Sequence, residues 1–171
     1  MRLFREPFPD PATVVPAPSR DHRHATQLFN ASMSYARLIL RRYGELAPFA
    51  FSMDDEGVIT RETLEIPRLP RDPERLYKLL TDHVATRTQR GLLTGVAVTA
   101  NVTLATPSAE NFTDAILLSI EQNSGHALQI TVPYKIHGGQ LHNLIPRRIT
   151  LGQTVTEEAA PRFAFANSLT R

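Results

Sequence analysis

The sequence predicts an α+β domain with the order helix, hairpin, helix and antiparallel meander, in which the helices pack on one face of a single antiparallel sheet. Segments 21–44 and 72–91 repeat apolar residues at helical spacing, whereas segments 47–66 and 92–151 contain stretches that alternate apolar and polar residues, as strands do. The chain has 171 residues, of which 42% are hydrophobic and 21% charged, so it has the size of one ordinary domain. We expect a Pro-rich arm over residues 1–20, the domain over 21–152 and a C-terminal tail over 153–171.

Composition excludes several functions. The chain has no cysteine, which excludes disulfides, thiolate catalysis and cysteine-ligated metals. No apolar run approaches the roughly 18 residues of a membrane span, and the N-terminal segment lacks the apolar stretch of a secretory signal. The net charge is +2 without a dense basic cluster. We therefore expect a soluble cytoplasmic protein with no membrane partner, no nucleic-acid partner and no cofactor.

Prolines rule out a helix or a central strand in the N-terminal arm, so it is expected to be extended; they are Pro7, Pro9, Pro11, Pro16 and Pro18. The first helix is predicted from Asp21 as its N-cap to Gly44 as its stop. Its buried side is predicted to carry Ala25, Leu28, Phe29, Ser32, Ala36, Ile39, Leu40 and Tyr43.

A hairpin follows the first helix. Phe49, Phe51 and Met53 alternate with small or polar residues, and the β-branched run after Gly57 supplies the second strand. A three-residue loop with Gly57 in the left-handed conformation places Met53 opposite Ile59.

The second helix is predicted over 72–91, with Asp72 as its cap, Pro73 at its first position and Gly91 at its end. His83 lies beside the apolar stripe of this helix and is interpreted as a packing residue. The stripe consists of Leu76, Leu79, Leu80 and Val84.

The rest of the domain reads as strands over 92–104, 115–122 and 127–136. One face of the first strand is predicted to point to the core; it carries Val96, Val98, Ala100, Val102 and Leu104. The next strands are predicted to turn Ile116, Leu118, Ile120, Leu128, Ile130, Val132, Tyr134 and Ile136 to the same core. The opposite, semi-polar face would then carry Thr99, Asn101, Thr103, Ser119, Gln129 and Thr131.

The turn between the last two of these strands fixes their register. A three-residue loop with Gly125 in the left-handed conformation places Ile120 opposite Leu128. Glu121 then pairs with Ala127 on the semi-polar face, where we expect it to be solvated, and His126 lies at the mouth of the turn. Glu121 and His126 are the catalytic candidates, but the turn explains their proximity without any reaction.

A second tight turn at Gly138 and Gly139 is predicted to place Ile136 opposite Leu141 and Lys135 opposite His142. His137 and His142 would then approach each other, and with Glu121 they are the candidate zinc ligands. No third ligand stands at a fixed spacing, so no metal is predicted. Near the C-terminus, a short helix before Pro161 and a strand over 163–166 both remain open.

The stretches PFAFSMDDEG and DAILLSIEQNSG carry a resemblance. The order of elements over residues 21–150 resembles roadblock-type dimerisation domains, and the two stretches also resemble bacterial single-domain families of unknown function. The resemblance implies a protein-interaction role and transfers no active residue. Roadblock-type domains end in a firm helix, and the tail with Pro161 departs from that pattern.

Two functions follow from the semi-polar face. The first is a non-enzymatic interaction domain that self-associates or binds another protein. The alternative is a small enzyme or ligand-binding protein, with Glu121 assisted by His126, His137 or His142 and with ligand-binding candidates Thr99, Asn101, Gln129 and Tyr134. A concave face with a pocket favours the ligand, and a flat face favours assembly.

Overall fold

The computed structural model describes residues 18–106, 111–139 and 145–166. The helices are α1 (Arg20–Tyr43) and α2 (Pro73–Gln89), and the strands are β1 (Phe49–Met53), β2 (Ile59–Arg61), β3 (Gly95–Thr103), β4 (Asp114–Gln122), β5 (Ala127–His137), β6 (Arg148–Leu151) and β7 (Val155–Ala159). None of the helices in the described ranges is both long and apolar enough to cross a membrane.

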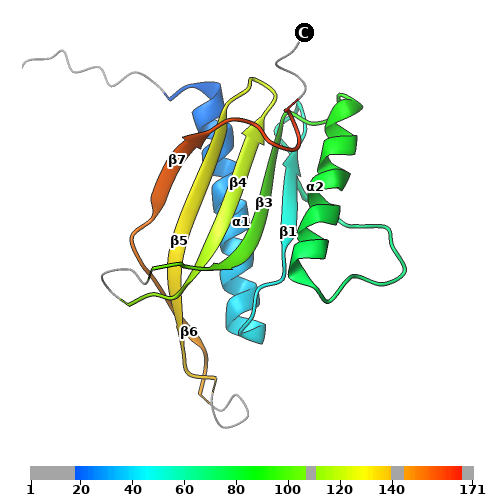
Figure 1. Cartoon of the computed structure of the whole chain (residues 1–171). Coiled ribbons are helices and arrows are strands. Elements are labelled where there is room, and N and C mark those ends of the chain that lie inside the picture. Colours follow the sequence, from blue (N-terminus) through cyan, green and yellow to red (C-terminus); the bar gives the residue numbers. More distant parts are fainter. Residues whose placement is uncertain (1–17, 107–110, 140–144, 167–171) are drawn as a thin grey trace, which may run out of the picture.

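All the strands belong to one antiparallel sheet, which confirms the α+β class (Figure 1). The sheet has the order β2-β1-β3-β4-β5-β6. The first half of β5 pairs with β7, from Ala127 opposite Ala159 to Thr131 opposite Val155. Its second half pairs with β6, so β7 and β6 together form one edge of the sheet.

The two helices cover opposite faces of the sheet, so the prediction that they share one face is wrong. α1 packs on a core that includes Phe49, Met53 and Ala97. α2 packs on a second core that includes Val96 and Val98, the neighbours of Ala97 along β3. Successive residues of a strand point to opposite faces, so these cores lie on opposite sides. In Figure 1, α1 lies behind the sheet and α2 lies next to β1.

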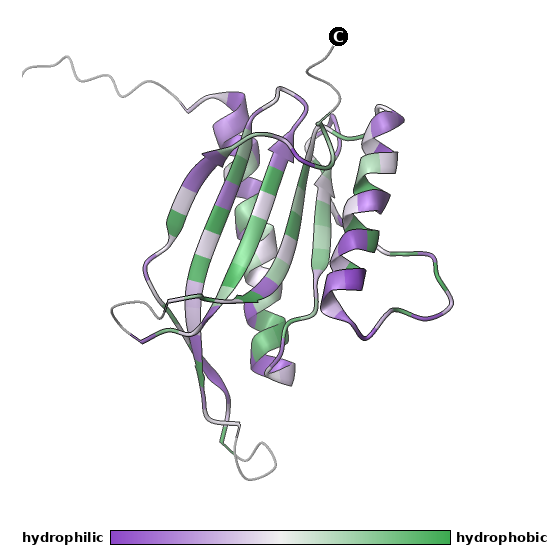
Figure 2. Ribbon diagram, in the orientation of Figure 1, coloured by the Kyte–Doolittle hydropathy of each residue, from purple (hydrophilic) through white to green (hydrophobic). Residues whose placement is uncertain are grey.

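The predicted semi-polar face is also wrong, because the register divides its residues between the two sides. Val98 pairs with Ser119, and Thr99 pairs with Leu118. Thr99 and Asn101 therefore share the α1 face with the apolar residues of β4, whereas Ser119, Gln129 and Thr131 share the α2 face. Figure 2 shows hydrophobic and hydrophilic residues alternating along β5, the pattern expected when one side of a strand is less covered than the other.

The local signals for helix ends are largely confirmed. Gly44 ends α1 in the left-handed conformation with φ 79°, and its N–H donates to the Leu40 carbonyl. The side chain of Asp72 accepts from the Glu74 N–H and caps α2. The N-cap of α1 is Ser19 instead of the predicted Asp21, because the helix begins two residues earlier and the Ser19 hydroxyl accepts from the His22 N–H.

Both three-residue hairpin loops are confirmed. Gly57 has φ 82° and Met53 pairs with Ile59. Gly125 has φ 87° and Ile120 pairs with Leu128, so the register of β4 and β5 is as predicted. Glu121 pairs with Ala127, also as predicted.

The third hairpin differs from its prediction. Ile136 pairs with Ile149 and Lys135 with Thr150, so the tight Gly138-Gly139 turn does not return the chain directly. The Gly139 N–H donates to the Ile145 carbonyl, which closes a longer connection. Leu141 and His142, the predicted partners, lie outside the described residues.

The segment expected as a tail is part of the packed structure. β7 extends the sheet, and neither the short helix before Pro161 nor a strand over 163–166 forms. Ala164 and Phe165 are buried in the α2-side core. In Figure 1 this red end of the chain crosses the upper ends of the strands toward α2.

Candidate functional site

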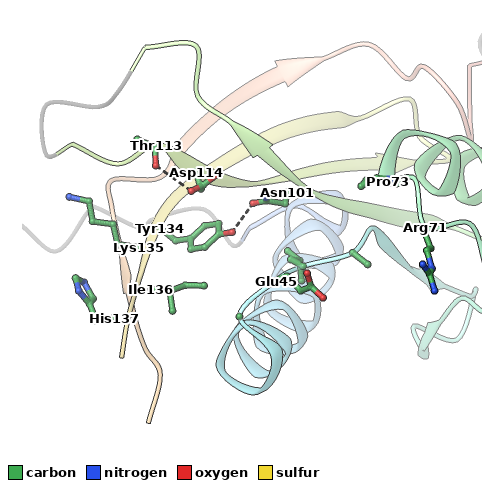
Figure 3. A pocket seen from close by; sticks show the side chains of 13 residues that line it. Glu45, Arg71, Pro73, Asn101, Thr113, Asp114, Tyr134, Lys135, Ile136 and His137 are labelled. Atoms are coloured by element: carbon green, nitrogen blue, oxygen red, sulfur yellow. Dashed lines mark hydrogen bonds between the residues drawn. The ribbon is translucent and has the colours of Figure 1, made fainter. Parts of the chain in front are cut away.

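A cleft of about 730 Å³ lies at one end of the sheet. It lies between the α1–β1 connection, the ends of β3, β4 and β5, and the residues that start α2 (Figure 3). Leu46 and Ile136 form an apolar part of the wall of this cleft, and Asn101 and Tyr134 contribute polar groups to it.

A hydrogen bond between two non-adjacent strands sets the polar wall of this cleft. The Tyr134 hydroxyl on β5 donates to Asn101 Oδ1 on β3 over 2.7 Å. The Tyr134 ring therefore crosses β4 on the α1 face, as Figure 3 shows. Tyr134 is only 6% exposed, whereas Asn101 is exposed to the cleft, so a buried tyrosine holds an accessible amide in place.

The environment of Tyr134 keeps its hydroxyl protonated. Burial raises its pKa, and the negative charge of Asp114 raises it further, to about 12. Both effects disfavour the phenolate. At neutral pH, Tyr134 is therefore a hydrogen-bond donor and not a base.

Charged residues of both signs surround the polar pair. Glu45 and Arg71 lie at the α1 end and at the start of α2, and Asp114 accepts a hydrogen bond from the Thr113 hydroxyl over 3.2 Å. The Lys135 ammonium lies 4.8 Å from the centre of the Phe112 ring. In Figure 3, Lys135 and His137 point away from the Tyr134 ring, because they occupy the other side of β5. The mixed charges give the cleft no single sign.

Glu121 is a structural anchor, and the expectation that it is solvated is wrong. It is 3% exposed and lies on the α2 face. Its carboxylate accepts the backbone N–H groups of four consecutive residues: Arg162, Phe163, Ala164 and Phe165. An ionised carboxylate that accepts several N–H bonds is a strong acceptor, and here all of them tie the C-terminal segment to the sheet.

The other catalytic candidate lies elsewhere. His126 Nδ1 is 3.1 Å from Gln122 Nε2, and the same amide group also donates to the Asp21 carbonyl at the start of α1. Gln122 is on the α1 face and Glu121 on the α2 face, so the two candidates do not form one site.

The remaining ligand-binding candidates are dispersed. Gln129 lines a smaller pocket of about 310 Å³ on the α2 face, between Glu121 and the edge of the sheet. Thr99 is fully buried under α1, and its hydroxyl has no hydrogen-bond partner among the described residues. Only Asn101 and Tyr134 come together.

Of the candidate zinc ligands, His137 lines the cleft, Glu121 is engaged by the C-terminal segment and His142 lies outside the described residues. Across the described ranges, no group of three histidine, aspartate or glutamate side chains is placed to hold a metal ion.

A second buried glutamate, Glu62, is not among the candidates predicted from the sequence. Glu62 follows β2 and accepts hydrogen bonds from Ser52 on β1 and Arg87 on α2, while His83 Nε2 lies 2.9 Å from its other oxygen. His83 is thus a polar partner and not only a packing residue. The spacing of His83 and Arg87, four residues apart on one helix face, was a signal for a shared partner.

Burial alone would raise the pKa of Glu62, but the hydrogen bonds from Ser52, Arg87 and His83 and the positive charge of Arg87 outweigh it and lower the pKa. Glu62 is therefore ionised at neutral pH. It holds α2 against the β1–β2 hairpin.

Comparisons of the chain with protein-family models, with curated proteins and with solved structures found no match.

Proposed function

We propose that this protein binds a small organic molecule in the cleft between α1 and the end of the sheet. The observation that carries the proposal is the Tyr134–Asn101 hydrogen bond, which fixes an exposed amide on the wall of a cavity of about 730 Å³. Ligand sites are concave, mostly formed in advance and equipped with few polar groups that set orientation. The cleft is concave, and the Tyr134–Asn101 hydrogen bond fixes the orientation of one of its polar groups.

The wall defines the chemistry of the ligand. Asn101 Oδ1 is engaged by Tyr134, so the amide nitrogen is the group that Asn101 offers to a ligand. A carbonyl oxygen on the ligand would accept from it. Leu46 and Ile136 would contact an apolar body. The negative charge of Asp114 beside Tyr134 disfavours an anion at this point, so we expect a neutral carbonyl or amide group.

Benzamide and benzoate test this proposal, since they share a shape and differ in charge. In a titration followed by amide NMR signals, we expect benzamide to shift the signals of Asn101, Tyr134, Leu46 and Ile136 more strongly than benzoate does. Asn101→Ala should weaken the response, whereas the control Gln129→Ala, on the other face, should leave it unchanged. No response to either probe, or a response away from the cleft, would contradict the proposal.

Self-association is a second candidate, because the described residues leave part of the α2 face uncovered. α2 and the C-terminal segment cover β1, β3 and the end of β4, but Leu117, Ser119, Gln129 and Thr131 stay partly exposed (Figure 1). A second subunit on this strip would make the protein a dimer. Sedimentation equilibrium of the wild type and of Gln129→Arg tests this: a dimer that the substitution dissociates supports it, and a monomer at high concentration contradicts it.

A further inference from the structure

An apolar groove of about 350 Å³ runs between the first turns of α1 and the β5–β7 edge of the sheet. Ala25 and Phe29 form its helical side, and Leu128 and Ile130 form its floor. Thr154 and Thr156 border it along the edge. The groove lies on the α1 face and shares no lining residue with the cleft.

We propose that the N-terminal arm of the same chain, residues 1–17, docks in this groove through Val14 and Val15. The arm joins the described chain at Pro18, directly before the Ser19 cap of α1. The first residue that lines the groove is His22. The groove therefore opens next to the point where the arm meets the domain.

The Pro18 backbone is itself held at this point. The Arg23 guanidinium donates to the Pro18 carbonyl over 3.2 Å. Because Arg23 belongs to the first turns of α1, this bond fixes the direction in which the chain enters the helix.

Lengths along the arm match lengths along the groove. At about 1.5 Å per helical residue, Ala25 lies about 9 Å and Phe29 about 15 Å along the axis from Ser19. In an extended proline-rich chain with about 3.1 Å per residue, Val15 and Val14 would be about 9 and 12 Å from Pro18. An arm that reverses at Pro18 therefore places both valines between Ala25 and Phe29.

The chemistry of the arm fits the groove. Val14 and Val15 are the apolar pair of the arm nearest to α1, and they stand between Pro11 and Pro16. Prolines restrict the unfolded arm and so reduce the entropy lost when it docks. Proline also lacks the N–H needed to pair with the β7 edge, which favours side-chain contact with the groove over the addition of a strand.

A spin label tests the docking in the full-length protein. The chain has no cysteine, so Ala12→Cys gives a single attachment site for a nitroxide. We expect the label to broaden the amide signals of Ala25, Thr26, Phe29 and Ile130 strongly, and those of β1 and β2 little. Val14→Asp with Val15→Asp should restore the intensity of the broadened signals. Leu3→Asp, the matched control farther along the arm, should not.

Two outcomes would overturn the proposal. In the first, the amide signals beside the groove do not broaden, all signals of the domain broaden equally, or the valine substitutions do not change the broadening. In the second, these signals also broaden when spin-labelled chains without the NMR isotope are mixed with isotope-labelled chains without the spin label. In that case the arm of a second copy fills the groove. Unchanged signals from β3 and β4 in each variant would show that the domain is still folded.

Discussion

The two faces of the sheet are held to their coverings by different kinds of interaction. On the α1 face, a long helix buries a continuous apolar core in which Leu28, Leu118 and Ile120 are fully buried. On the α2 face, a smaller core is supplemented by two buried carboxylates, Glu62 and Glu121, each of which attaches one covering segment. The covering of the α1 face thus relies mainly on apolar contact, whereas the coverings of the α2 face add hydrogen bonds to buried carboxylates.

The two carboxylates reach this result in different ways. Glu62 is satisfied by side chains, because Arg87 and His83 reach it from α2. Glu121 is satisfied by the backbone N–H groups of residues 162–165, an irregular segment that has no sheet or helix partners for them. One carboxylate neutralises charge, and the other completes the hydrogen bonds of a loop.

The largest effect on stability is expected for a substitution on the α1 face. Leu118→Ala removes a fully buried side chain from the centre of the α1-side core. We expect it to lower the free energy of unfolding by about 2–5 kcal/mol, because it loses apolar burial and leaves a cavity. Urea unfolding measures this change, and a loss below about 1 kcal/mol would mean that α1 is not tightly packed.

Glu121→Gln is expected to lower the free energy of unfolding by about 3 kcal/mol, because the amide group of glutamine cannot accept from all four N–H groups. Proteolysis within residues 160–166 should become faster. Glu157→Gln, on the exposed β7 strand, is the matched control and should change stability by less than about 0.5 kcal/mol. Equal effects of the two substitutions would show that the Glu121 carboxylate does not hold the C-terminal segment against the sheet.

Glu62→Gln is expected to cost about 1–3 kcal/mol at neutral pH, since it weakens the bonds to Ser52, Arg87 and His83. The pKa of Glu62 is lowered in the folded state, so its stabilisation is present above the reference value of 4.5 and is lost as the pH falls through the folded pKa. The stability difference between wild type and variant should therefore shrink in acid.

Unfolding at a series of pH values measures this difference. Glu65→Gln, at an exposed neighbour, is the control for a general effect of charge. A difference that stayed constant from neutral pH to below 4.5 would show that the Glu62 carboxylate does not hold α2.

The smallest effect is expected at the turn between β4 and β5. This turn sets the register of the two strands and so determines which of their residues lie on each face. Gly125→Val should destabilise the protein by about 1 kcal/mol or more, because a β-branched residue is a poor occupant of a left-handed position with φ 87°. Ser124→Ala in the same loop serves as the control. An unchanged melting temperature in the valine variant would show that the loop can adopt another conformation.

The candidate site was predictable only in part. Asn101 and Tyr134 were both ligand-binding candidates from sequence, but Tyr134 was assigned to the core and Asn101 to the opposite face. The structure joins them on one face because the Tyr134 ring reaches diagonally across β4. The residues that complete the cleft, Glu45, Leu46 and Arg71, come from connections whose position no periodicity indicates.

Local sequence signals correctly predict the α+β class, the C-terminal end of α1, the N-cap of α2 and the two three-residue hairpins. Each of these depends on local chemistry: Gly44 and Gly125 accept a left-handed backbone, and the Asp72 side chain accepts the Glu74 N–H at the start of α2.

The face that each helix covers and the segments that the buried glutamates hold follow from packing between distant parts of the chain. Alternation states which residues of one strand share a side, but β3 is apolar on both sides, with Val96 and Ala97 both fully buried, so the pattern cannot assign either side to α1 or α2. Glu121 meets the backbone of Ala164, and Glu62 meets Arg87, across long intervals of sequence. The spacing of His83 and Arg87 indicates a shared partner, but no local pattern identifies Glu62 as that partner, because the packing of the whole sheet selects it.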